Sequence, residues 1–217
     1  MKQLLTKDDI CRMMSRAATK LREESALLSE LDSVAGDGDH GSSMVRVANV
    51  LEKTFSPDNP VCCKELFQQA GWSTLSADGG ASTSLLGTFL LGVADGCAAQ
   101  TNTLDSRQLA NSFRAGLIAL QKQTKAVPGD KTLMDALVPA VDGMLEAAEN
   151  EENVEDALRK AADAARQGAD STRNLTARYG RAKLQGERTK GHADPGATSV
   201  ALLFEGFHQG FTERDRS

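Results

Sequence analysis

The chain has 217 residues, of which 40% are hydrophobic and 25% are charged, and 25 Lys and Arg against 30 Asp and Glu give a net charge of −5. This composition is typical of one globular domain over residues 1–217 and excludes a disordered chain. The acidic balance argues against nucleic acid as a partner. Aromatic residues are only 4% of the chain, which favours closely packed helices over a β-sandwich.

Apolar residues recur at helical spacing in eight segments. They span about residues 7–28, 41–56, 62–70, 82–97, 105–120, 131–145, 154–175 and 197–211. Thr6 and Asp9 form a capping pattern before the first segment, Asp130 is a candidate cap for the sixth, and Pro139 predicts a kink or break within the sixth. Alternation at period two is scarce. The pattern predicts an all-α fold, a bundle of eight antiparallel helices with little or no sheet.

The N-terminal ten residues carry charge and lack a long apolar run, so a signal peptide is not expected. The most apolar stretch, residues 85–93, is far shorter than the roughly 20 residues that a membrane-spanning helix needs. The four cysteines fit neither a disulfide framework nor a structural zinc site. We therefore expect a cytoplasmic protein with reduced thiols and no membrane partner.

Three aspartates crowd the junction between the first two predicted helices. Asp32, Asp37 and Asp39 lie within eight residues that also contain two glycines, which let a turn fold back so that carboxylates converge. Such close like charges repel unless a cation compensates. An EF-hand loop is excluded, because the twelfth position from Asp37 is Ala48 and not Glu. The pattern predicts Mg²⁺ shared with phosphates, and the alternative is a set of caps and turns, which explains one Asp but not three.

Further Gly-rich junctions occur at residues 76–82, 127–132 and 186–199. The first runs into the N-terminus of a strongly apolar helix, where backbone N–H groups and the helix dipole suit an anion. A Gly-Gly turn is also a common way to begin any helix. Neither a P-loop nor a Rossmann fingerprint occurs in the sequence.

Two of the three histidines, His40 and His192, lie in these junctions, which indicates a role in positioning phosphate or nucleotide. His208 falls in the last helix and is interpreted as a packed or surface residue. The basic run at residues 173–190 is either a solvated face or a source of Arg for phosphate. From the residues alone, the chain is an all-helical binder of Mg²⁺ and phosphate, and a nucleotide fits these features best.

Taken together, the junctions resemble the nucleotide-binding L subunit of dihydroxyacetone kinases, a DAK2-type domain. The motifs that carry the resemblance read Leu31-Asp32, Gly36-Asp-Gly-Asp-His-Gly41, Gly79-Gly-Ala-Ser82, Pro128-Gly-Asp-Lys-Thr132, Gly180-Arg-Ala182, Gly186-Glu-Arg188 and Gly191-His-x-Asp-Pro-Gly-Ala-Thr-Ser199. They run in the family's order over nearly the whole chain. Thr83-Ser84 departs from the Gly-Pro that is common there in the family.

The resemblance implies a barrel of eight antiparallel helices that binds ADP or ATP with two Mg²⁺ at one end. The metals would be held by Asp32, Asp37 and Asp39. The nucleotide would contact His40, Gly41, Ser42, Ser43, Ala81, Ser82, Leu133, Arg181, Asp194, Pro195 and Gly196. No catalytic acid or base is implied on this chain, since positioning and charge neutralisation carry phosphoryl transfer.

The resemblance also implies partners. A separate K-type subunit would hold the sugar covalently, dihydroxyacetone or a related ketose such as erythrulose, so the chain would be inactive alone. The phosphoryl donor would be exchanging ATP or a phosphotransferase-system protein that rephosphorylates bound ADP. A rival hypothesis is an ADP-loaded regulatory module that binds a transcription regulator or kinase partner without turnover. A purely structural bundle would show no Mg²⁺-dependent nucleotide binding.

Overall fold

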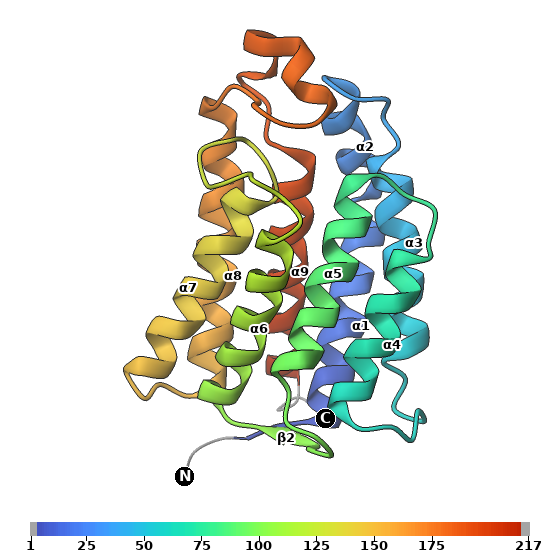
Figure 1. Cartoon of the computed structure of the whole chain (residues 1–217), viewed down its shortest axis with the longest axis vertical. Helices are drawn as coiled ribbons and strands as arrows, with labels where there is room; N and C mark the ends of the chain where they lie inside the picture. The colour runs from blue at the N-terminus through green and yellow to red at the C-terminus, as the bar shows by residue number, and fades with distance from the viewer. Residues whose placement is uncertain (1–3, 214–217) are drawn as a thin grey trace.

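The computed structural model describes residues 4–213, and residues 1–3 and 214–217 lie outside this range, including the first three of the charged N-terminal segment. Helices dominate the described residues (Figure 1). They are α1 (Lys7–Glu23), α2 (Ser25–Ser33), α3 (His40–Thr54), α4 (Cys63–Leu75), α5 (Ala81–Gly96), α6 (Ser106–Gln121), α7 (Met134–Glu149), α8 (Val154–Ser171) and α9 (Pro195–Thr212), with the 3-10 helices η1 (Thr172–Asn174) and η2 (Arg181–Thr189). The strands β1 (Leu5–Thr6) and β2 (Thr103–Leu104) pair antiparallel. The all-α prediction is confirmed.

Eight of these helices close into a barrel (Figure 1). Around the ring, α9 packs between α1 and α8, and the order continues through α7, α6, α5, α4 and α3 back to α1. Neighbouring helices of the ring run in opposite directions, and α2 lies at one end of the ring. This arrangement gathers the connections 34–39, 76–80, 122–133 and 172–194 at the end that is uppermost in Figure 1.

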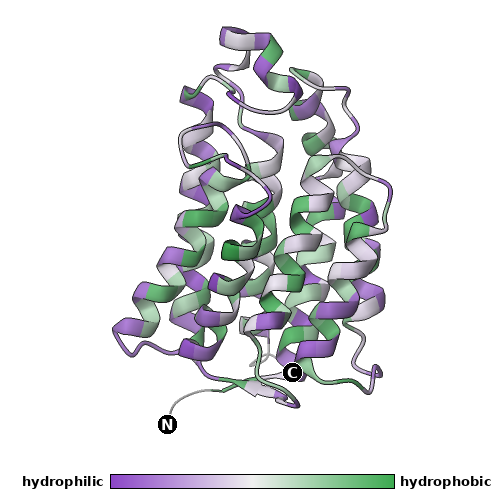
Figure 2. Ribbon diagram, viewed as in Figure 1, coloured by the Kyte–Doolittle hydropathy of each residue, from purple (hydrophilic) through white to green (hydrophobic). Residues whose placement is uncertain are grey.

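Apolar side chains fill the space between the helices, as the hydropathy colouring of Figure 2 shows. At the centre, Phe113 makes edge-to-face contacts with Phe89, Phe204 and Phe207, at ring-centroid distances of 5.7, 5.8 and 6.0 Å. Such pairs add stabilisation beyond their buried area. They connect α5, α6 and α9 across the barrel, which gives the loops at its end a rigid base.

Side-chain caps explain where several helices begin. Thr6 accepts a hydrogen bond from the Asp9 N–H at 3.2 Å, and the Asp9 carboxylate accepts one from the Thr6 N–H at 2.8 Å. This capping box confirms the sequence prediction for α1. Asp105 and Asn153 cap α6 and α8 in the same way, through the N–H groups three residues later.

The first helix is shorter than predicted. It ends at Glu23, because the backbone at Glu24 leaves helical geometry (φ −98°, ψ 11°), and α2 then begins at Ser25. The single helix expected over residues 7–28 is therefore two, which raises the helix count in the described residues from the predicted eight to nine.

Two expectations for the sixth segment, a cap at Asp130 and a break at Pro139, are wrong. Asp130 does not cap it, because its carboxylate accepts from the Val127 N–H at 2.9 Å and α7 begins only at Met134. Pro139 does not break it, because α7 runs unbroken to Glu149. Proline has no N–H to donate to the carbonyl four residues earlier, that of Asp135.

Helix α8 accommodates that carbonyl. A Cβ atom on Gly168 would lie only 2.0 Å from the Asp135 oxygen, so glycine lets the backbone of α8 approach it directly. Close Cα–H···O=C approaches of this kind recur at helix interfaces. The proline in α7 and the glycine in α8 are thus complementary parts of one contact.

None of the helices in residues 4–213 is long and apolar enough to cross a membrane.

Candidate functional site

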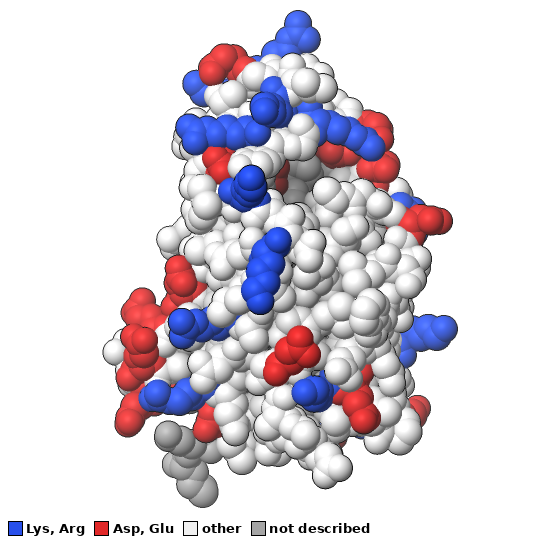
Figure 3. Space-filling model, viewed as in Figure 1, with Lys and Arg blue, Asp and Glu red and all other residues white. Residues whose placement is uncertain are grey.

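The four connections at the upper end of the barrel surround a cavity of about 380 Å³. In the space-filling view the hollow lies beneath a row of Lys and Arg side chains, with Asp and Glu side chains at its edge (Figure 3). The cavity is therefore bordered by both signs of charge, in a molecule whose net charge is −5.

Twelve of the fourteen residues predicted for the site line this cavity. They are Asp32, Asp37, Asp39, His40, Ser43, Ala81, Ser82, Leu133, Arg181, Asp194, Pro195 and Gly196. Gly41 and Ser42 do not line it. Gly41 is buried against α2, where a Cβ would lie 2.0 Å from the Ser25 carbonyl oxygen, and the exposed Ser42 donates its hydroxyl to the Asp39 carbonyl at 2.8 Å.

The three aspartates converge as the sequence predicted. One carboxylate oxygen of each lies within 4.8 Å of the others, with Asp32 half-buried and Asp37 and Asp39 exposed. The turn is shaped by Gly38, whose φ of +77° suits glycine, and by the Gly36 N–H, which donates to the Asp32 carbonyl at 2.5 Å. A set made only of carboxylate oxygens fits a hard cation such as Mg²⁺.

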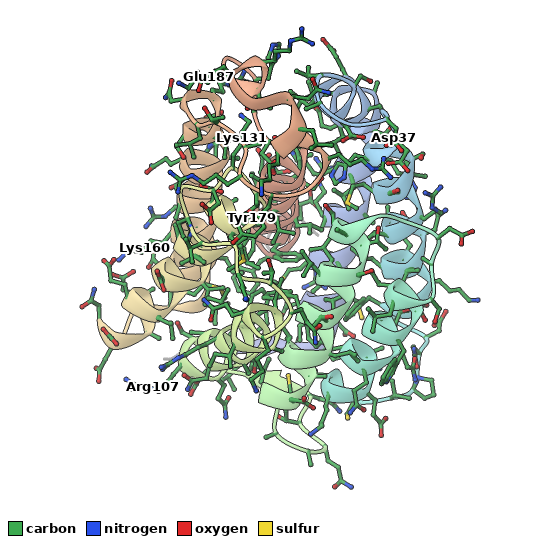
Figure 4. The ribbon with its side chains drawn as sticks, turned by 45° about the horizontal axis from the view of Figure 1, so that its top comes forward. Asp37, Arg107, Lys131, Lys160, Tyr179 and Glu187 are labelled. Atoms are coloured by element: carbon green, nitrogen blue, oxygen red, sulfur yellow. The ribbon has the colours of Figure 1, made fainter. Side chains whose placement is uncertain are left out.

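A cation of the chain itself compensates part of this charge. The Arg181 guanidinium from η2 forms an ion pair with the Asp37 carboxylate. This hydrogen-bonded contact lowers the pKa of Asp37 and raises that of Arg181. It also joins the segment after α8 to the turn before α3, across the mouth of the cavity. In Figure 4 Asp37 lies on the opposite side of this opening from Lys131 and Tyr179.

His40 forms part of the cavity wall. Its Nε2 lies 2.7 Å from the Ser199 hydroxyl, which in turn donates to the Pro195 carbonyl at 3.1 Å. Burial lowers the pKa of His40, so the imidazole is neutral at pH 7. The contact fastens the first turn of α3 to the first turn of α9 and fixes both beside the aspartates.

The N-terminus of α5 opens onto the same cavity. Within the described residues no side chain caps this helix, which begins after Gly80 in extended conformation. Arg46 holds the preceding turn through the Asp78 carbonyl and also donates to the Ser43 hydroxyl at 2.9 Å. Helix N-terminal N–H groups without a side-chain acceptor suit a phosphate oxygen, and those of Ala81 and Ser82 are placed for it.

Asp194 is the cap of α9, with its carboxylate accepting from the Ala197 N–H at 2.7 Å. Burial raises the pKa of Asp194 to about 7, more than its hydrogen bonds and the nearby Lys131 lower it. A negative charge at this position is therefore poorly solvated. Because Asp194 lines the cavity, a ligand hydroxyl or amide could donate a hydrogen bond to its carboxylate in place of water.

The cavity-lining residues that sequence reasoning missed include Thr83, Lys131 and Tyr179. Lys131 belongs to the junction at residues 127–132, so its motif was visible, but nothing in that motif said where the side chain points. The Thr83 hydroxyl is buried and has no hydrogen-bond partner among residues 4–213, a feature that only the fold reveals.

Leu31, Leu85 and Met134 add apolar surface to the same cavity. One end thus offers carboxylates and a helix N-terminus for a metal-bound phosphate, and the remainder offers apolar contact for a flat ring. Fold and cavity together define a class: helical barrels with a cavity at one end that is lined by carboxylates and by a helix N-terminus.

Comparisons with known proteins identify the family within this class. The model of the DAK2 domain matches residues 34–209. The ADP-binding subunit DhaL of PEP-dependent dihydroxyacetone kinase 1 from Listeria innocua is 36% identical over 94% of this chain and 96% of its own length. The corresponding subunit from Escherichia coli is 36% identical over 93% of this chain and 95% of its own.

A solved structure agrees in fold. The dihydroxyacetone kinase of C. freundii, in complex with AMP-PNP and Mg²⁺, superposes with a TM-score of 0.71 at 24% identity, over 92% of this chain and 33% of that one. The chain belongs to the DAK2 domain family of dihydroxyacetone kinases, as an L-type subunit. This confirms the resemblance drawn from the motifs and the expectation of a phosphotransferase family.

Proposed function

We propose that this chain is the cytoplasmic nucleotide-binding subunit of a short-ketose kinase of the dihydroxyacetone type. It binds ADP or ATP with two Mg²⁺ and passes the phosphoryl group to a sugar that a separate K-type subunit holds. The observation that supports this best is the convergence, in one cavity, of three carboxylates and a helix N-terminus that no side chain of the described residues caps.

Different residues bind different parts of the nucleotide. Asp32, Asp37 and Asp39 hold the Mg²⁺ ions, which when bound neutralise charge on the phosphate oxygens. The N–H groups at the start of α5 receive the phosphates, and the Ser43 hydroxyl is held beside them by Arg46. Neutral His40 contributes no charge of its own and keeps α3 and α9 in register.

The base and ribose occupy the other part of the cavity. Leu133, Pro195 and Gly196 supply apolar and backbone contact there, and Asp194 and Arg181 supply polar groups. The chain therefore acts by positioning and charge neutralisation, and the sugar has to be presented by its partner.

The direct test is calorimetric titration of ADP, with Mg²⁺ and with EDTA, on the wild type and on Asp37→Asn. We expect binding that requires Mg²⁺ and that is weakened at least a hundredfold in the variant. Asp58→Asn, at an exposed position in the connection between α3 and α4, is the matched control and should bind like the wild type. Equal ADP binding in EDTA would overturn the metal assignment.

A second assay separates the kinase from the regulatory alternative. The chain is mixed with the K-type subunit from its own source, ATP and dihydroxyacetone, and with a phosphotransferase-system donor in place of ATP. Sugar phosphate should form only when both subunits are present. Tight ADP binding without phosphate transfer from either donor would instead favour the regulatory module.

A further inference from the structure

Lys131 is a buried cation at the edge of the nucleotide cavity. Only 5% of the residue is exposed, and its backbone adopts φ +59°, a left-handed conformation that side chains other than glycine rarely take. The residue is followed by Thr132, whose N–H donates to the Asp135 carboxylate at 2.7 Å. The strained backbone and the burial of the charge both cost free energy, which other contacts of the residue have to offset.

The ammonium group of Lys131 binds two backbone carbonyls from a different part of the chain. It donates to the Thr172 oxygen at 2.6 Å and to the His192 oxygen at 2.5 Å. These two carbonyls flank residues 173–191, which we call the cover segment. One side chain therefore holds both ends of the segment together.

Other hydrogen bonds also hold the two ends of the cover segment together, and we call these joined ends the neck. The Gly191 N–H donates to the Arg173 carbonyl at 2.8 Å, and the Asp194 N–H donates to the Thr172 hydroxyl at 2.8 Å. The loop that carries Lys131 makes a further contact, since the Asp130 carbonyl accepts from the Arg178 N–H at 3.1 Å. These contacts close the neck. Among the described residues, Lys131 supplies the only charged donor to the carbonyls of Thr172 and His192.

The cover segment closes one side of the nucleotide cavity. Its residues Tyr179, Gly180, Arg181 and Ala182 line the cavity, and Arg181 reaches across to Asp37. Figure 4 shows Lys131 and Tyr179 on the same side of the barrel end, across from Asp37. The position of the cover over a bound ligand thus depends on the neck.

Charge and burial agree with this arrangement. Burial lowers the pKa of Lys131, and the carboxylates of Asp194 and Asp135 oppose that effect. The two hydrogen bonds that the ammonium group donates and the two nearby carboxylates compensate its lost hydration. Without the ammonium group, the two carbonyls would lose their charge-assisted donor inside the neck.

We propose that Lys131 is a positioning residue that fixes the cover segment over the nucleotide cavity and thereby sets how long a nucleotide stays bound. This rests on the proposed function, because it takes the cavity to hold ADP. The ammonium group of Lys131 is engaged by the carbonyls of Thr172 and His192. Its effect on nucleotide binding passes through the cover segment.

The experiment compares Lys131→Met with the wild type. Methionine keeps the length of the side chain but cannot donate. We measure dissociation of a fluorescent ADP analogue in Mg²⁺ by stopped flow, and amide hydrogen exchange across the chain. We expect dissociation at least tenfold faster, association within threefold, and exchange in the cover segment at least tenfold faster, with exchange in α1 and α5 unchanged.

Lys20→Met is the matched control. Lys20 is also largely buried, with 17% of its side chain exposed, and pairs with Glu205 at 3.2 Å, on the outside of the α1–α9 contact. It should leave dissociation and cover-segment exchange within twofold of the wild type. Lys131→Arg, which keeps the charge and the donors, should restore most of the slow dissociation.

The outcomes distinguish a failure of the role of Lys131 from a failure of the proposed function. If Lys131→Met matches Lys20→Met in dissociation and exchange, the positioning role is wrong. If the wild type binds no ADP, the proposed function fails, while the exchange data still show whether Lys131 fixes the cover. Should Lys131→Met not fold, Lys131→Gln, which retains one donor group, carries the same comparison with an expected threefold effect.

Discussion

Two carboxylates at the cavity have opposite environments. Asp37 is exposed, and its pKa is lowered by Arg181, whereas Asp194 is half-buried, and burial raises its pKa to about 7. Ionised Asp194 therefore costs folding free energy that ionised Asp37 does not. Each environment gives a prediction that a single substitution can test.

Asp194→Asn keeps a cap acceptor for α9 and removes the charge. Because the pKa of Asp194 is higher in the folded than in the unfolded chain, wild-type stability is lost as pH rises through about 7. The variant should gain on the order of 2 kcal/mol relative to the wild type at pH 8, roughly 4–8 °C in Tm, and little at pH 4. Calorimetry in EDTA without nucleotide checks this, and a Tm difference that does not change with pH would contradict it.

Arg181→Gln frees Asp37 from its ion pair and removes a positive charge beside the three aspartates. Binding of a divalent cation to the nucleotide-free chain should strengthen about two- to fivefold, because exposed ion pairs are weak competitors. Mn²⁺ titration followed by electron paramagnetic resonance measures this. Arg178→Gln removes another cation of the cover segment, one that pairs with Asp130 at 3.3 Å, and should have no effect. An equal gain in both variants would show a general charge effect instead.

At the scale of helices, the barrel depends on a few close backbone approaches. The clearest lies between α7 and α8, where Gly168 faces the Asp135 carbonyl that Pro139 leaves without its helical donor. The same pair of helices contains a second glycine, Gly143, at which a Cβ would meet nothing nearer than 3.4 Å, the Lys160 carbonyl oxygen. The two positions form a natural comparison.

Gly168→Ala should destabilise the chain by about 2–3 kcal/mol, because a Cβ at 2.0 Å from a backbone oxygen forces α8 away from α7. Gly143→Ala should be neutral or stabilising by up to about 1 kcal/mol, since alanine favours the helix and has room. Urea unfolding followed by circular dichroism measures both. Equal losses of stability would mean that the approach of α8 to Asp135 is not tight.

The sequence predicted where a helix begins or ends only when residues close to that point in the chain determine it. The Thr6–Asp9 capping box was predicted because its two residues lie only three positions apart. The end of α1 at Glu24 has no Gly or Pro to mark it. The tolerance of α7 for Pro139 depends on a glycine from another helix, which no local pattern contains.

The residues of the site also differ in whether nearby sequence could predict their role. The three aspartates were predictable because they lie in one short turn, and their repulsion is a local fact. The role of Lys131 was not, because its partners, the carbonyls of Thr172 and His192, lie more than 40 residues away along the chain. Backbone carbonyls carry no sequence signature, so only the fold could show that this lysine binds them.

For the whole molecule, the cavity joins parts of the chain that are far apart in sequence. Its walls come from the turn before α3, the starts of α5, α7 and α9, and the cover segment. The ion pair between Asp37 and Arg181 and the contact between His40 and Ser199 already connect these parts without a ligand. A ligand in the cavity therefore contacts structure that exists only when the whole barrel is folded.

Such a ligand must raise the stability of the entire chain. At a free concentration of 100 times its Kd, ADP with Mg²⁺ should add about 2.7 kcal/mol, which for a chain of this size is roughly 5–10 °C in Tm. ADP in EDTA should add almost nothing, because the carboxylates repel the phosphates. Differential scanning calorimetry over a series of ADP concentrations measures the shift. A single transition that moves upward with ADP would show that the cavity and the barrel unfold together, whereas a separate transition that alone responds to ADP would show that the cavity end unfolds by itself.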